Sequence, residues 1–137
     1  MDTAGWAEPV LGNTPDHDRM AAAYRHAVAS RRPLVTTNYV LSEVVALLTA
    51  RSRASRPQLL ALMAAIRTLP RLRIVHVDLA LDAAAWSLLE QASDKQWSLV
   101  DAASLVVMRR LGIEQAFTSD HHFAQAGFMC VPAPSLY

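Results

Sequence analysis

The chain has 137 residues, of which 53% are hydrophobic and 18% charged, and its formal net charge is +1. This composition is typical of one globular domain with a hydrophobic core, and it excludes a largely disordered chain. The apolar run Leu59 to Ile66 is far shorter than the ~20 residues of a membrane span. Since the first residues also lack the pattern of a secretory signal, we expect a single domain over 1–137, in the cytoplasm and without a membrane partner.

Charge is unevenly distributed along the chain. Residues 1–18 contain four acids and no Lys or Arg, residues 19–77 contain ten Arg and one acid, and residues 78–137 contain seven acids and three basic residues. A basic middle segment suits a protein that binds phosphates, and acidic flanks suit a metal site. An ordinary solvent-exposed surface whose basic residues happen to be arginines explains the middle segment equally well. The charge pattern therefore leaves both interpretations open.

The hydrophobic pattern predicts helices that alternate with short strands. In chain order the expected elements are a helix over 14–31, a strand over 34–37, helices over 39–51 and 57–69, a strand over 73–77, helices over 79–92 and 100–111, a strand over 116–118, a short helix over 121–126 and a strand over 128–131. Strands separated by helices run parallel, with helices on both faces. The expected fold class is α/β, with ligands bound at the carboxyl ends of the strands.

Glu43 is the most informative acidic residue. Its neighbours at three and four positions on either side are Tyr39, Val40, Ala46 and Leu47, so it lies on an apolar helix face. A carboxylate taken out of water is costly unless a cation or hydrogen-bond donors compensate. Glu43 therefore indicates a metal site, with a salt bridge to one of the many Arg residues as the alternative.

Three further acids are candidates: Asp101 and Asp120 stand at predicted helix starts, and Asp2 lies next to the chain terminus. Asp101 and Asp120 could be simple helix caps, and Asp2 a solvated residue near the start. Together with Glu43 they offer oxygen ligands without the Cys and His spacing of zinc sites, which indicates Mg²⁺ or Mn²⁺. Such a metal activates water for phosphodiester hydrolysis, so the four acids are the expected catalytic and metal-binding residues of a nuclease.

Four short segments carry these acids. They are Asp2-Thr3-Ala4-Gly5-Trp6, Thr36-Thr37-Asn38-Tyr39-Val40-Leu41-Ser42-Glu43, Trp97-Ser98-Leu99-Val100-Asp101-Ala102-Ala103-Ser104 and Ala116-Phe117-Thr118-Ser119-Asp120-His121-His122-Phe123. In this order and spacing they resemble the motifs of PIN-domain ribonucleases, and among them the VapC-like toxins of toxin–antitoxin pairs. The resemblance covers essentially the whole chain.

The resemblance implies a three-layer α/β/α sandwich with a central parallel sheet. It also implies an endoribonuclease dependent on Mg²⁺ or Mn²⁺, with an RNA substrate, a cognate antitoxin and a homodimeric assembly. By the family pattern the four acids bind the metal, while Thr3 and either Thr118 or Ser119 support them through hydroxyl groups.

One feature departs from the family pattern. In the family the first acid ends a central apolar strand, whereas only Met1 precedes Asp2 here, and one residue cannot form a strand of ~5 residues. We expect that the native protein starts further upstream. The alternative is that another chain fills the middle of the sheet.

Other interpretations of the chain are weaker. His121 and His122 are more typical of a solvated pair at a helix start than of a general base or metal ligands. A non-cleaving RNA-binding module of the same fold is the main alternative function. A receiver-type phosphoacceptor domain is disfavoured because the only lysine, Lys95, lies in a loop, and a haloacid-dehalogenase-type phosphatase because Ala4 occupies the place of its second Asp.

Overall fold

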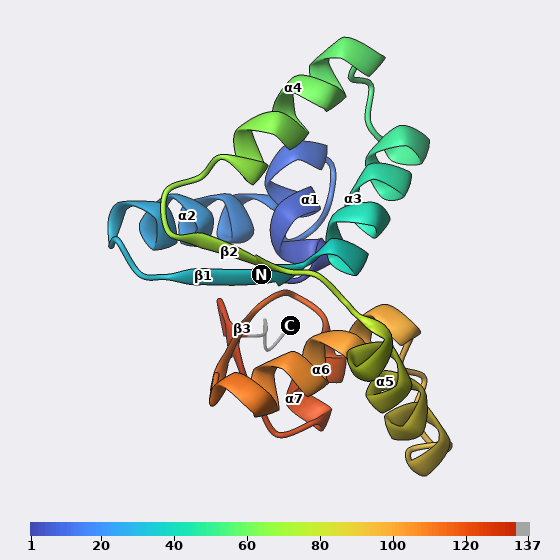
Figure 1. Ribbon diagram of the computed structural model, residues 1–137. Coiled ribbons are helices and arrows are strands. Elements are labelled where there is room, and N and C mark those ends of the chain that lie inside the picture. Colours follow the sequence, from blue (N-terminus) through green and yellow to red (C-terminus); the bar gives the residue numbers. More distant parts are fainter. Residues whose placement is uncertain (134–137) are drawn as a thin grey trace.

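Helices and short parallel strands alternate along the chain in the computed structural model, which describes residues 1–133 (Figure 1). The elements are α1 (Thr3–Leu11), α2 (His17–Ala29), β1 (Leu34–Thr37), α3 (Asn38–Arg51), α4 (Arg56–Arg67), β2 (Leu72–Val75), α5 (Leu79–Gln91), α6 (Leu99–Leu111), β3 (Gln115–Phe117), α7 (His121–Gln125) and β4 (Met129–Val131). In Figure 1, β1 and β2 separate α1–α4 from α5–α7. The expected α/β class is confirmed, and every predicted element is present within a few residues of its expected bounds.

Helix α1 is absent from the elements that the hydrophobic pattern predicts. Gly5 and Pro9 lie inside it, and both residue types weaken an isolated helix. Tertiary packing compensates, because Trp6 and Ala7 are buried in the core. Gly5 also packs so closely that a Cβ atom there would lie 2.5 Å from the carbonyl oxygen of Phe117. The helix therefore forms where the backbone of β3 can be approached closely.

The four strands form two separate parallel pairs. β1 pairs with β2, with Leu34 opposite Leu72, and β3 pairs with β4, with Gln115 opposite Met129. The parallel direction is as expected. Within residues 1–133, however, no strand pairing joins these two sheets, so the expected central sheet is interrupted between the pairs.

Met1 and Asp2 connect the two pairs at the carboxyl ends of the strands. The α-amine of Met1 donates a 2.8 Å hydrogen bond to the carbonyl of Val35 in β1, and the amide of Asp2 donates one of 3.2 Å to the carbonyl of Phe117 in β3. Beside Met1 and Asp2 lies a cavity of about 440 Å³, lined mainly by residues of β1, β3, α2 and α6. The interruption of the sheet is therefore an apolar space between two strand edges.

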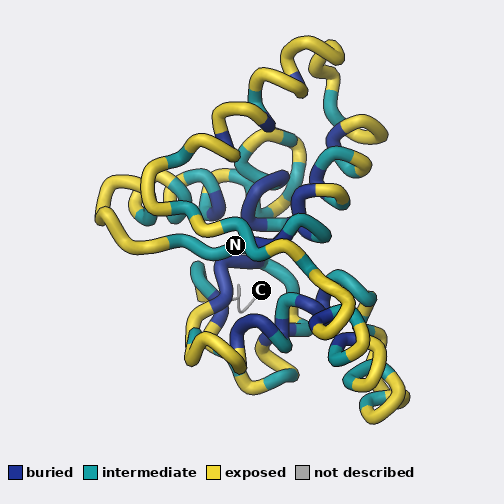
Figure 2. The backbone as a smooth tube through the Cα atoms, in the orientation of Figure 1, coloured by how far each residue is buried: buried dark blue, intermediate teal, exposed yellow. Residues whose placement is uncertain are grey.

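The hydrophobic core is divided among clusters on either side of the strands. The largest combines α1, α3 and α4, and a second combines α6, β3, α7 and β4 around Leu105 and Phe123. Figure 2 shows the buried segments gathered where α1, α3 and the strand pairs meet, while the outer turns of α4 and α5 are exposed. No helix of residues 1–133 is long and apolar enough to cross a bilayer. The centre of the fold is thus also the place where the motif residues converge.

Candidate active site

Asp2 lies at the junction between the strand pairs. It precedes α1 in extended conformation, and its side chain is 6% exposed. The hydroxyl of Thr118, fully buried just after β3, donates a 3.0 Å hydrogen bond to Oδ2 of Asp2. Burial raises the pKa of the Asp2 carboxyl from 3.8 to about 6, against the hydrogen bonds from Thr3 and Thr118, and the charge of Asp101 raises it further. Asp2 is therefore a buried, hydrogen-bonded residue and not a solvated one.

Asp101 enters the site from the first turn of α6. Its amide donates a 3.0 Å hydrogen bond to the hydroxyl of Ser98, and its Oδ2 accepts one of 2.8 Å from the amide of Ser98. This reciprocal capping box fixes the start of the helix. Asp101 is only 8% exposed. The capping role is thus real, and it holds the carboxylate against the site.

Asp120 caps the short helix α7. Its Oδ1 accepts a 2.9 Å hydrogen bond from the amide of His122, and its own amide donates one of 2.9 Å to the hydroxyl of Thr118. Thr118 therefore connects Asp2 with Asp120 through one hydroxyl. Ser119 instead donates a 2.7 Å hydrogen bond to Glu8. Of the two hydroxyls that the sequence leaves open, Thr118 supports the acids and Ser119 does not contact them.

Glu43 approaches the site from α3, on the side of α1. Its Oε2 accepts a 2.6 Å hydrogen bond from the hydroxyl of Thr3. Among the ion pairs within residues 1–133, none joins Glu43 to an arginine. The alternative of a structural salt bridge is therefore wrong for the described part of the chain, and the hydrogen-bond partner of Glu43 is Thr3.

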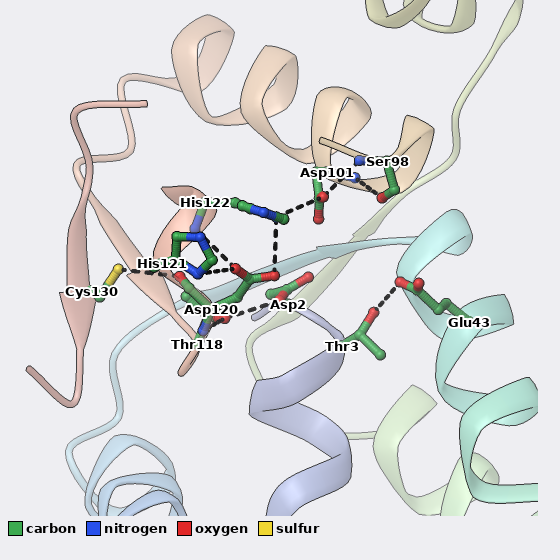
Figure 3. A network of polar contacts seen from close by, with 10 residues as sticks. All are labelled: Asp2, Thr3, Glu43, Ser98, Asp101, Thr118, Asp120, His121, His122 and Cys130. Atoms are coloured by element: carbon green, nitrogen blue, oxygen red, sulfur yellow. Dashed lines mark hydrogen bonds and ion pairs between the residues drawn. The ribbon is translucent and has the colours of Figure 1, made fainter. Parts of the chain in front are cut away.

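Figure 3 shows how these side chains lie. Asp2, Asp101 and Asp120 turn towards one region between α6, α7 and the start of α1, whereas the carboxylate of Glu43 turns towards Thr3 on the α3 side. Four acids from separate segments of the chain thus gather near one edge of the interrupted sheet. Like charges brought together in this way destabilise one another unless a cation or protons intervene.

The interpretation of His121 and His122 as a solvated pair is wrong for His122. The His121 side chain is 71% exposed, but that of His122 is 18% exposed and lies between two acids (Figure 3). Its Nδ1 is 3.4 Å from Oδ2 of Asp101 and 3.4 Å from Oδ2 of Asp120. The sequence could not reveal this position, because it depends on how α7 packs against α6.

Comparison with known proteins shows the family of this chain. Residues 2–129 match the family model of the PIN domain. The chain belongs to the PIN-domain family. Two curated relatives, the 23S rRNA-specific endonucleases VapC20 of two Mycobacterium tuberculosis strains, are each 38% identical to this PIN domain over 130 residues, which is 94% of either chain. The resemblance drawn from the four motifs is thereby confirmed.

A solved structure shows the same fold. The crystal structure of VapC20 from Mycobacterium tuberculosis, a sarcin–ricin loop cleaving toxin, superposes on this PIN domain with a TM-score of 0.78 and 34% sequence identity, covering 93% of each chain. The fold of this chain therefore agrees with that of a solved toxin structure over nearly its whole length.

The donor atoms of this PIN domain fit a divalent metal ion. Carboxylates of separate elements converge, and the nearby Nδ1 of His122 is buried without a hydrogen-bond partner. Ligand atoms of Asp120, His121 and His122 also lie within 4.8 Å of one another. Buried polar atoms are nearly always satisfied in proteins, so a buried nitrogen without a hydrogen-bond partner beside two carboxylates fits a place among metal ligands.

Proposed function

We propose that this PIN-domain protein is a metal-dependent endoribonuclease that hydrolyses RNA phosphodiester bonds, with Mg²⁺ or Mn²⁺ as cofactor. The observation that carries the proposal is the convergence of Asp2, Asp101 and Asp120, which Figure 3 makes visible. The similarity to the VapC20 endonucleases over nearly the whole chain supports it. Ribosomal RNA, the substrate class named for those relatives, is the first substrate to test.

The proposed mechanism assigns a role to each residue of the site. Asp2, Asp101 and Asp120 hold the metal, and Glu43 adds a carboxylate on the α3 side. When bound, the metal supplies a water of lowered pKa and neutralises charge on the phosphate. Thr118 orients Asp2 and fixes the backbone of Asp120, and Thr3 orients Glu43. No nucleophilic side chain is needed.

The proposal extends to the biology of the protein. We expect it to act as a toxin in the cytoplasm, as one domain over residues 1–137, as a homodimer and with a cognate antitoxin. Exposed arginines on α3, the following turn and the start of α4 provide cationic surface for an RNA backbone or an acidic antitoxin segment: Arg51, Arg53 and Arg56. Expression without the antitoxin should slow growth, and normal growth with verified soluble protein would contradict the toxin role.

An RNA cleavage assay tests the catalytic proposal. Purified protein is incubated with ribosomal RNA and Mn²⁺ or Mg²⁺, beside Asp101→Asn and the matched surface variant Asp94→Asn, whose side chain is 72% exposed. We expect cleavage by the wild type and Asp94→Asn, loss of cleavage in Asp101→Asn, and loss in all three with a chelator. Equal cleavage by Asp101→Asn would contradict the site. RNA binding without cleavage would favour the non-cleaving module of the same fold.

A further inference from the structure

His122 is held in the site by the packing of α7. The next residue, Phe123, is 1% exposed and belongs to the cluster formed with Leu105 and Met108 of α6. The Phe123 anchor fixes α7 beside α6, and the hydrogen bond from the His122 amide to Asp120 fixes the first turn. As a result the imidazole of His122 lies between Asp101 of one helix and Asp120 of the other (Figure 3).

The contacts of the His122 ring differ from those of a hydrogen-bonded histidine. A hydrogen bond from an imidazole to a carboxylate has a length of about 2.7–3.2 Å. Nδ1 is instead 3.4 Å from each acid and makes no hydrogen bond, although the atom is buried. Two ligand atoms on a Mg²⁺- or Mn²⁺-sized ion are about 3 Å apart, because each bond is about 2.1 Å long. Ligand atoms of Asp120 and His122 also lie within 4.8 Å of each other. The spacing therefore suits His122 and Asp120 as donors to one cation, with Asp101 3.4 Å from the same nitrogen.

His121 shows what the same residue type does outside this position. Its ring is 71% exposed, and its Nδ1 lies 3.6 Å from Oδ1 of Asp120, the oxygen that already accepts the His122 amide. The two rings lie side by side, with centroids 4.5 Å apart. His121 has no contact with Asp101 among the ion pairs of residues 1–133. Both histidines have a ligand atom within 4.8 Å of Asp120, so a comparison of the two single variants decides which ring binds the metal.

We infer that His122 is a nitrogen ligand of the metal held by Asp101 and Asp120, and that it makes this site prefer a first-row transition metal over Mg²⁺. The inference rests on the proposed function and deepens it, since it concerns the cofactor of the same site. Mg²⁺ takes oxygen ligands almost exclusively, whereas imidazole nitrogen binds first-row transition metals well. A site of carboxylates alone would have no such preference built into it.

Pulsed electron paramagnetic resonance of the Mn²⁺-loaded protein tests this ligand directly. We expect a coupling between Mn²⁺ and a nitrogen nucleus that changes when the histidines are labelled with ¹⁵N. The coupling should persist in His121→Gln and vanish in His122→Gln. Labelling of the wild type keeps the test valid even if a variant fails to fold. Bound Mn²⁺ without nitrogen coupling, or coupling lost only in His121→Gln, would overturn the inference.

Metal affinities give a second readout, and RNA cleavage separates the two proposals. We expect His122→Gln to weaken Mn²⁺ binding at least about tenfold, while Mg²⁺ binding, measured by competition, changes by less than about threefold. RNA cleavage by a protein whose bound Mn²⁺ shows no nitrogen coupling would overturn the role of His122 and support the proposed function. Mn²⁺ that is coupled to a histidine nitrogen, in a protein that does not cleave RNA, would support the role of His122 and contradict the proposed function. Absence of Mn²⁺ binding in the wild type would overturn both.

Discussion

The hydroxyl of Thr3 donates a 2.6 Å hydrogen bond to Oε2 of Glu43, which lies 40 positions further along the chain. Thr3 is buried at the first turn of α1, and Glu43 is half-buried in α3. Because no arginine within residues 1–133 pairs with Glu43, this hydroxyl is the group that sets the direction of its carboxylate. The segment Asp2-Thr3-Ala4-Gly5-Trp6 thus contains one of the acids, Asp2, and orients another, Glu43, through Thr3.

Replacement of Thr3 by valine tests that orienting role. Valine keeps the shape of threonine but cannot donate, so Glu43 loses its partner, and we expect kcat for RNA cleavage to fall about 10- to 100-fold, as for other groups that orient metal-site acids. Thr3→Ser keeps the hydroxyl and should remain within a few-fold of wild type. If Thr3→Val and Thr3→Ser cleave equally well, the hydrogen bond has no role in catalysis.

Asp2 should lower the stability of the metal-free protein at neutral pH. The pKa of the Asp2 carboxyl is about 6 in the folded protein and 3.8 in the unfolded chain. The protonated carboxyl therefore contributes to folding stability below pH 4, and this contribution is lost as the pH rises through about 6. Asparagine does not ionise, so Asp2→Asn avoids this pH-dependent loss of stability. We expect the variant to be more stable than wild type at pH 7, by on the order of 2 kcal/mol, and similar at pH 4, in urea unfolding with a chelator present.

The same substitution should abolish RNA cleavage, because asparagine cannot supply the charge that a metal ligand needs. A variant that is more stable than wild type but inactive would show that Asp2 is needed for cleavage and lowers the free energy of unfolding. Equal stability of Asp2→Asn and wild type at pH 7 would contradict the burial effect on the Asp2 pKa.

Gly5→Ala tests the close approach of α1 to β3. Alanine favours a helix over glycine by about 1 kcal/mol, but its Cβ would lie 2.5 Å from the carbonyl oxygen of Phe117, a backbone atom that cannot turn aside. We expect the clash to dominate and destabilise the protein by about 1–3 kcal/mol. The resulting shift of α1 should also weaken metal binding through Asp2. A more stable Gly5→Ala variant in chemical denaturation would refute the close packing.

An apolar strand placed ahead of Met1 should stabilise the fold. The cavity of about 440 Å³ is lined by β1, β3 and Met1 itself, and Met1 and Asp2 are hydrogen-bonded to Val35 of β1 and Phe117 of β3, so residues added ahead of Met1 start beside the cavity. We expect an added Val-Ile-Val-Leu to raise the free energy of unfolding by about 2 kcal/mol or more. The change should be accompanied by slower amide exchange in β1 and β3.

The control for this experiment is an added Gly-Ser-Gly-Ser. Burial lowers the pKa of the Met1 α-amine to about 6, so either extension removes an unfavourable buried charge. Only the apolar one fills the cavity. Equal stability of the two extended proteins would show that the space between the strand pairs does not accept a strand.

The sequence by itself determined the local structure and the identity of the acids. Apolar periodicity and the capping residues specify nearly every helix and strand, because these signals act over a few neighbouring residues. Glu43 could be selected from its apolar neighbours, and Ser98 with Asp101 from the spacing of a capping box. The order of the four motif segments was sufficient to identify the PIN-domain family.

Only the tertiary structure decided which groups meet. Helix α1 forms despite Gly5 and Pro9 because Trp6 and Ala7 are buried in the core shared with α3 and α4, while Gly5 lies against Phe117, more than 100 residues away. The choice of Thr118 over Ser119, and the position of His122 between Asp101 and Asp120, depend on how α6 and α7 pack against the strands. Local sequence signals carry no information about such long-range contacts, so the composition of the site had to come from the fold.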